Sequence, residues 1–270
     1  MADPDSSIAA PPPAEQQQPQ LIVGAADKET PFGPTAGNAA EGVAAHPRSS
    51  NPATHATGVE GLDLHRGVLT AAEQDALVCF VNGMLDKGEA GGLLPNTYRP
   101  NTNRAFVKRA QSRDTLQFGN CYTHQNRIYN GEMEPLPPLL TECIRRLTSA
   151  GIFTEATQPT TCTVNVYKVG QWLPPHVDNR NFARPFCTVS LCSEQAVVFG
   201  SKVEKVGDGM FEGGARIYMP VGSALRVAGE AADTLYHAGA RYPPYIYTYI
   251  YIYISATRRP SSYHLYLVVQ

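Results

Sequence analysis

Residues 163–178 read TVNVYKVGQWLPPHVD. The first seven residues are rich in β-branched and aromatic side chains, which predicts a β-strand that ends near Gly170. His176 and Asp178 follow two residues apart, so on an extended chain both side chains point to the same face. The stretch therefore predicts a β-rich fold in which an imidazole and a carboxylate can bind one metal ion from the same face.

Short runs of the same kind lie on both sides of this stretch. After Gly151 the chain contains CTVNVYKV, FCTVSLCS, AVVFGS, ARIYMPV and SALRVAG, separated by Gly, Pro, Asp and Asn. Their spacing of roughly 8–12 residues is typical of a β-sandwich or barrel. Upstream, GLDLHRGVL at 61–69 predicts a further short strand or turn.

Two helices are predicted before the run of strands. Thr70 and Glu73 form the T-x-x-E pattern of a capping box, and apolar residues at helical spacing predict a helix over 71–86. Prolines near its start and Gly151 after its end predict a second helix over 137–147. The expected fold class is mainly β with flanking helices (α+β), built as a double-stranded β-helix, or jelly roll.

A third candidate ligand lies about sixty residues downstream, at His237. Two histidines and one carboxylate form the facial triad of non-haem Fe(II) oxygenases, which leaves three coordination positions open. The alternative reading of His176 and Asp178 is a surface histidine and a turn-forming aspartate. The β-rich span before His237 favours the triad, because a jelly roll brings its far end back to its near end.

Several motifs in order resemble one known family. They are N-x-Y-x-x-G at 165–170, P-P-H-x-D at 174–178, R-P-F-x-T-V-S-L at 184–191 and A-A-D-x-x-x-H at 231–237. Together they resemble the AlkB-type Fe(II)/2-oxoglutarate dioxygenases, and within these the plant branch similar to RNA N6-methyladenosine demethylases. The resemblance runs from about residue 59 to residue 237.

The resemblance implies a role for each matched residue. His176, Asp178 and His237 would bind Fe(II), and Asn165 and Tyr167 would contact 2-oxoglutarate. The alternative for Asn165 is a polar residue paired with the backbone of its strand, and for Tyr167 it is ordinary core packing. The co-substrate would chelate iron through its keto and one carboxylate oxygen, and the reaction would be oxidative demethylation of N-methylated bases, N6-methyladenosine first among them.

A basic segment at 98–113 is the predicted substrate contact. It holds five cations and no acidic residue, whereas residues 58–240 as a whole hold 17 basic and 18 acidic residues. Aromatic side chains among cations are what single-stranded RNA binding requires. The residues predicted to contact methylated messenger RNA are Arg104, Phe106, Lys108 and Arg109. The alternative is an ordinary solvated loop.

Composition excludes several classes of protein. A formal net charge of −2 excludes a globally basic nucleic-acid binder, and six cysteines are too few for a disulfide scaffold. No apolar run reaches the roughly 18 residues of a membrane span, and the N-terminus lacks the pattern of a secretory signal. We expect location in the nucleus and/or the cytoplasm, with no membrane contact, and the sequence indicates no protein partner.

Four segments are expected along the chain. Residues 1–57 form a disordered Ala/Pro-rich tail, and 58–150 form an extension with helices and the nucleotide-recognition segment. Residues 151–240 form the jelly-roll core, and 241–270 form an atypical tail with a Tyr/Ile repeat.

The C-terminal segment departs from the family pattern. Members carry a strand of the type R-I-S-I-T-x-R about ten residues after the distal histidine, and its first arginine pairs with the distal carboxylate of 2-oxoglutarate. This chain has YIYTYIYIYI at 245–254 instead. The fragment ISATRR at 254–259 faintly echoes the missing strand, but it lies some seventeen residues beyond His237, and Tyr253 stands where the leading arginine belongs. The repeat predicts a strand over 245–254. Arg241, Arg258 or Arg259 could replace the arginine.

The missing arginine leaves two alternative functions open. One is a catalytically weakened module of the same fold that binds RNA. The other is a jelly-roll oxygenase whose substrate is not a nucleic acid.

Overall fold

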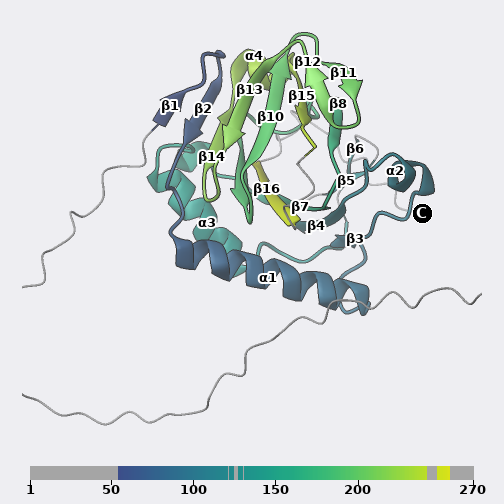
Figure 1. The fold of residues 1–270 in the computed structure, drawn as a ribbon. Coiled ribbons are helices and arrows are strands. Elements are labelled where there is room, and N and C mark those ends of the chain that lie inside the picture. The colour runs from purple at the N-terminus through teal and green to yellow at the C-terminus, as the bar shows by residue number, and fades with distance from the viewer. Residues whose placement is uncertain (1–53, 121, 125–126, 130, 242–247, 256–270) are drawn as a thin grey trace, which may run out of the picture. The chain divides into compact units, whose positions relative to one another are not determined.

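The computed structural model describes residues 54–120, 122–124, 127–129, 131–241 and 248–255. All of them belong to one compact unit, in which two β-sheets stack and two long helices run beneath the larger sheet (Figure 1). The fold is mainly β with flanking helices, and the predicted jelly roll is confirmed. Residues 1–53 of the expected disordered tail lie outside the described residues, and the prediction is wrong at Thr54–Ala56, which form strand β1 paired with β2 (Leu62–His65).

The larger sheet has eight strands in the order β1-β2-β14-β9-β16-β7-β4-β3, and the smaller has four in the order β13-β10-β15-β8. The strands of the larger sheet are β1 Thr54–Ala56, β2 Leu62–His65, β14 Ala224–Val227, β9 Phe186–Leu191, β16 Thr248–Ser255, β7 Thr161–Lys168, β4 Asp114–Gly119 and β3 Tyr98–Arg99. Those of the smaller sheet are β13 Ala215–Met219, β10 Gln195–Gly200, β15 Tyr236–Gly239 and β8 Leu173–His176.

Two hairpins and the helices complete the described structure. The hairpins pair β11 Glu204–Gly207 with β12 Met210–Glu212, and β5 Tyr122–His124 with β6 Arg127–Tyr129. The helices are α1 Ala71–Glu89, α2 Arg104–Lys108, α3 Pro138–Ser149 and α4 Gly229–Asp233, with a 3-10 turn at Glu155–Thr157. Both predicted helices are therefore confirmed, the first ending three residues later than expected. Within the described residues, no helix is long and apolar enough to cross a membrane.

Strand β7 divides the interior into two apolar clusters. Its Val164 and Val166 pack with the buried faces of α1 and α3, whereas Tyr167 packs with residues of the smaller sheet such as Phe199. This alternation follows from the period of two along a strand. The residues at 163, 165 and 167 therefore belong to the face of β7 that looks toward the smaller sheet.

The Tyr/Ile repeat supplies the strand between β7 and β9. The strand predicted over 245–254 is observed as β16, and residues 245–247 lie outside the described residues. Ile252 and Ile254 are buried in the cluster beneath the sheet, so this face of the strand packs against the core. The register places position 251 opposite Asn165 and position 253 opposite Thr163. A segment that was expected to follow the core thus lies in the middle of its larger sheet.

Helix α1 begins at the predicted capping box. The amide of Glu73 donates to Thr70 Oγ1 (3.3 Å), and the amide of Thr70 donates to Glu73 Oε2 (2.7 Å). Glu73 also accepts a hydrogen bond from Arg146 Nε of α3 (2.7 Å), so one carboxylate links the two helices. Burial alone would raise the pKa of Glu73, but Arg146 and Thr70 lower it below its usual value of 4.5.

We expect Glu73→Gln to lower the free energy of unfolding by about 1 kcal/mol at pH 7, because the cap and the ion pair both weaken. The carboxylate is stabilised in the folded state, so its contribution is present above pH 4.5 and is lost as the pH falls through the lowered pKa. Urea unfolding at pH 7 and in acid measures this. Glu142→Gln, which breaks an exposed pair with Arg145 within α3, should leave stability unchanged. A Glu73 effect that does not depend on pH would contradict the assignment.

Candidate metal centre

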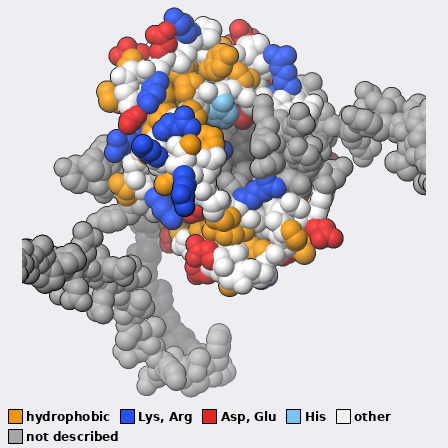
Figure 2. Space-filling view, turned by 90° about the vertical axis from the view of Figure 1, so that its right-hand side faces the viewer, with side chains coloured by type: hydrophobic (Ala, Val, Ile, Leu, Met, Phe, Trp, Pro, Cys, Tyr) orange, Lys and Arg blue, Asp and Glu red, His pale blue; other side chains and the backbone are white. Residues whose placement is uncertain are grey.

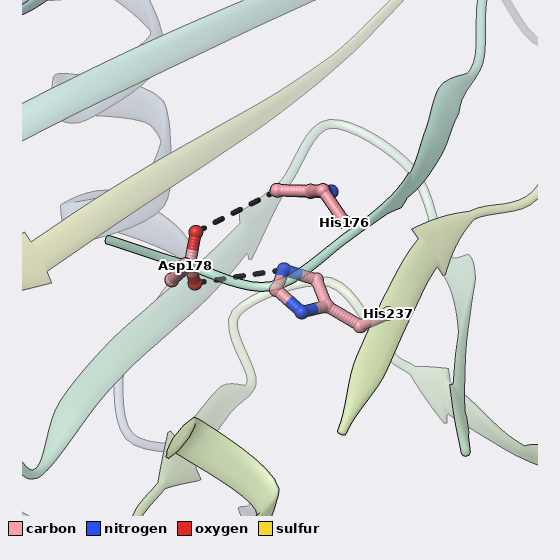
Figure 3. Close-up of side chains that lie close together, drawn as sticks. All are labelled: His176, Asp178 and His237. Atoms are coloured by element: carbon pink, nitrogen blue, oxygen red, sulfur yellow. Dashed lines mark ion pairs between the residues drawn. The ribbon is translucent and has the colours of Figure 1, made fainter. Parts of the chain in front are cut away.

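The pairing of β8 with β15 brings two distant histidines together. Its register sets His176 directly opposite His237, so both side chains lie on one face of the smaller sheet. Asp178 comes two residues after His176 and turns its carboxylate toward both rings (Figure 3). The three predicted ligands therefore converge, as the spacing of H-x-D and the returning strand predicted.

The distances in this cluster suit one cation. Asp178 Oδ1 lies 3.6 Å from His176 Nε2, and Asp178 Oδ2 lies 3.5 Å from His237 Nε2. The candidate ligand atoms all lie within 4.8 Å of one another. Two ligands at right angles and about 2.1 Å from one ion lie about 3 Å apart, so small side-chain shifts suffice. Two imidazole nitrogens and one carboxylate oxygen are the donor set of a non-haem Fe(II) site.

The surroundings of each histidine fix its ring. His176 Nδ1 lies 3.0 Å from the Pro174 carbonyl, and a proton on Nδ1 donates to that oxygen and leaves Nε2 free to bind a metal. The ring of His237 stacks on Phe199, with the ring centres 5.1 Å apart. The smaller sheet therefore holds both Nε2 atoms beside the carboxylate of Asp178.

The protonation states also suit a cation. Burial alone would raise the pKa of Asp178, but His237, His176 and Arg184 lower it to about 2. Burial and the neighbouring His176 lower the pKa of His237 to about 4, against the opposite pull of Asp178. Near neutral pH the carboxylate is ionised and His237 is neutral, which are the forms that bind metals.

Arg184 ties together the two chain segments that carry the ligands. Its Nε donates to Asp233 Oδ1 (3.1 Å), and its Nη2 donates to the carbonyl of Ala232 (3.0 Å), both just before β15. Its Nη1 donates to the carbonyls of Asn179 (3.3 Å) and Phe182 (3.0 Å), just after Asp178. The side chain is only 9% exposed, so these bonds form away from water. Arg184 stands in the R-P-F motif, but nothing in that motif indicates a positioning role, because the partners before β15 are distant in the sequence.

Asn165 and Tyr167 lie on β7, and Arg113 contacts both of them. Asn165 is partly buried and Tyr167 is buried, both on the face toward the smaller sheet. Arg113, just before β4, donates from Nε to Asn165 Oδ1 (2.7 Å), and its guanidinium carbon lies 5.9 Å from the centre of the Tyr167 ring. The sequence placed Arg113 in the basic segment, but its nearness to Asn165 depends on strand pairing and could not be read from spacing.

The four predicted RNA contacts, Arg104, Phe106, Lys108 and Arg109, lie together on the short helix α2 and at its C-terminal end, all exposed. The Arg109 guanidinium lies over the Phe106 ring, 5.5 Å from its centre. Figure 2 views the side of the molecule that carries α2 and shows Lys and Arg side chains gathered near a visible histidine. Their contact with RNA stays a prediction.

Of the three candidate replacements for the missing arginine, only Arg241 lies among the described residues. Arg241 is exposed; its amide donates to the Gly209 carbonyl (2.8 Å), and its guanidinium lies beside Gly170. Arg258 and Arg259 lie outside the described residues. Strand β16 carries the Tyr/Ile repeat and holds no arginine.

This combination of jelly roll and two-histidine, one-carboxylate cluster defines a class of metal-dependent oxygenase. The family model of the 2OG-Fe(II) oxygenase superfamily matches residues 61–245, and the chain belongs to that superfamily. Membership brings Fe(II) as the metal and 2-oxoglutarate as the co-substrate, and the cluster at His176, Asp178 and His237 fits the metal.

Relatives of stated function match the same region. Over 187 residues (66% of this chain and 36% of the relative), the chain is 37% identical to Arabidopsis thaliana "RNA demethylase ALKBH9B". It is 25% identical over 189 residues (66% of this chain and 32% of the relative) to Arabidopsis "RNA demethylase ALKBH10B". The chain thus spans about a third of the length of these curated relatives. The solved structure of OsALKBH1 shares the fold, with a TM-score of 0.51 at 12% identity, covering 72% of this chain and 97% of that one.

We expect Arg184→Ala to lower the free energy of unfolding by about 3 kcal/mol, because buried charged hydrogen bonds on both sides are lost together. Arg184→Lys should recover less than half, since one ammonium cannot reach both segments. Urea unfolding measures both variants. Arg180→Ala is the matched control: Arg180 is exposed and makes one 3.3 Å bond to the Asp233 carbonyl. Equal losses in the Arg180 and Arg184 variants would refute the role.

Proposed function

We propose that this chain is an Fe(II)/2-oxoglutarate-dependent demethylase of N-methylated bases in single-stranded RNA, with N6-methyladenosine as the first substrate to test. The observation that carries the proposal is the convergence of His176, Asp178 and His237 in a chain whose relatives are named RNA demethylases. Its site of action, in the nucleus and/or the cytoplasm, stays a prediction.

The overall reaction balances without a further reductant. One oxygen atom of O2 enters the methyl carbon, which leaves as formaldehyde, and the other enters succinate as 2-oxoglutarate loses CO2. Bound iron supplies the oxygen activation. His176, Asp178 and His237 would hold the metal; the Pro174 carbonyl orients His176, and the ring of Phe199 stacks on His237. Asn165 and Tyr167 line the neighbouring face of β7, where the co-substrate would bind.

The position of the site sets a condition on the substrate. A base inside a duplex cannot reach an iron held between two sheets, so the target must be single-stranded or flipped out. The exposed cations of α2 suit phosphates, and Phe106 offers an aromatic face for stacking. These features support RNA over a small molecule as the substrate.

The first test is formaldehyde release from a methylated RNA oligonucleotide with Fe(II) and 2-oxoglutarate. We expect turnover in the unmodified chain and at least a 100-fold loss in His176→Ala and Asp178→Asn, because removing a ligand empties the metal site. Asp208→Asn is the control, since Asp208 pairs with Lys205 in the β11–β12 hairpin. If the unmodified chain binds RNA but releases no more formaldehyde than His176→Ala, it is a binding module and the enzyme proposal fails.

The second test is the salt dependence of RNA binding. Each phosphate contact to a single strand contributes about 0.7 to the slope of log affinity against log salt. The double variant Arg104→Ala/Lys108→Ala should therefore reduce the slope by about 1.4. The double variant Lys87→Ala/Arg145→Ala, on exposed positions of α1 and α3, removes the same charge and should leave the slope unchanged. Equal slopes for both doubles would exclude α2 as the RNA contact.

A further inference from the structure

We propose that Arg113 binds the distal carboxylate of 2-oxoglutarate and so takes the role of the arginine that β16 lacks. The inference rests on the proposed function and names the residue that holds the co-substrate. Arg113 was not among the three arginines that the sequence analysis named as candidate replacements. The co-substrate role is assigned to it because it contacts Asn165.

The position of Arg113 follows from strand pairing. Strand β4 pairs with β7 so that Thr115 stands opposite Asn165, and Arg113 lies immediately before β4. From there Nε reaches Asn165 Oδ1 at 2.7 Å, and the guanidinium carbon lies 5.9 Å from the centre of the Tyr167 ring. A single cation therefore contacts both residues of β7 that were predicted to contact 2-oxoglutarate, Asn165 and Tyr167.

The backbone around Arg113 is held in place. The buried Ser112 accepts a hydrogen bond from Gln171 Nε2 (2.6 Å), and the Trp172 amide donates to the Ala110 carbonyl (2.9 Å). Both bonds fasten the segment before β4 to the turn between β7 and β8. Arg113 is thus presented from fixed backbone and is itself partly buried, unlike the exposed cations of α2.

The chemistry of the co-substrate requires such a group. 2-Oxoglutarate is a dianion; one carboxylate and the keto oxygen face the metal, and the other carboxylate needs a cation. A guanidinium can pair with a carboxylate through two parallel hydrogen bonds. Among the described residues, Arg113 donates only from Nε, which leaves the N–H groups of Nη1 and Nη2 for a ligand.

Three other cations near β7 and the metal cluster are less suited to bind the distal carboxylate. All three nitrogens of Arg184 donate to Asp233 or to backbone carbonyls. Arg241 lies beside Gly170. The side chain of Lys168 is 73% exposed, and its Nζ lies 3.5 Å from Asp114 Oδ2. Of the cations in the described part of the chain, Arg113 is the one that combines contact with Asn165, partial burial and available donors.

The experiment measures keto-acid binding to the full chain loaded with Mn(II), by calorimetry. We compare 2-oxoglutarate with 2-oxovalerate, which keeps the metal-chelating end but has a methyl group in place of the distal carboxylate. Arg113→Met should weaken 2-oxoglutarate binding about 30-fold. It should leave 2-oxovalerate binding within about 2-fold, so that the preference for the dicarboxylate disappears. Lys168→Met removes a nearby charge and should leave both affinities unchanged.

The other outcomes separate the inference from the proposed function. If Arg113→Met keeps the preference for 2-oxoglutarate, or weakens both keto acids equally, Arg113 does not bind the distal carboxylate. If it weakens RNA binding alone, it is a substrate contact, and the inference fails while the proposed function stands. If the unmodified chain binds no 2-oxoglutarate, the proposed function and the inference both fail.

Discussion

The antiparallel pairing of β8 with β15 is the constraint on which the site depends. It sets His176 opposite His237, although sixty residues separate them, and the short step to Asp178 then closes the cluster. A one-residue change in this register would turn one histidine to the other face of the sheet. Between β8 and β15, the strands β9, β10, β13 and β14 of the two main sheets return the chain to the edge of β8. Arg184 then links the segment after Asp178 to the segment before β15 by hydrogen bonds.

The sequence was sufficient where a signal is local and periodic. Each correct prediction depends on residues a few positions apart. The examples are the capping box at Thr70, the strand that became β7 and the H-x-D spacing, and all three are present in the structure. The third ligand, His237, was predicted because a facial triad needs a second histidine and the β-rich span before it can return the chain to H-x-D. The positioning role of Arg184 was not predicted, because its partners Asp233 and Ala232 lie nearly fifty residues away in the sequence.

What the sequence could not show depends on contacts across sheets. Arg113 looked like one of five cations in a basic segment, and only the pairing of β4 with β7 separates it from its neighbours on α2. The tail after residue 240 looked like the place where the fold ended. It lies in the larger sheet because the edges of β7 and β9 carry backbone N–H and C=O groups that need hydrogen-bond partners. Composition alone does not predict this pairing.

The repeat in β16 has a consequence for how this sheet assembles. Most strands carry a unique order of side chains, and sliding one along its neighbours mismatches the core. In β16 the isoleucines at 250, 252 and 254 recur every second residue, so a shift of two residues still leaves isoleucine at two of these three positions. The register of this central strand is therefore weakly encoded by its own side chains.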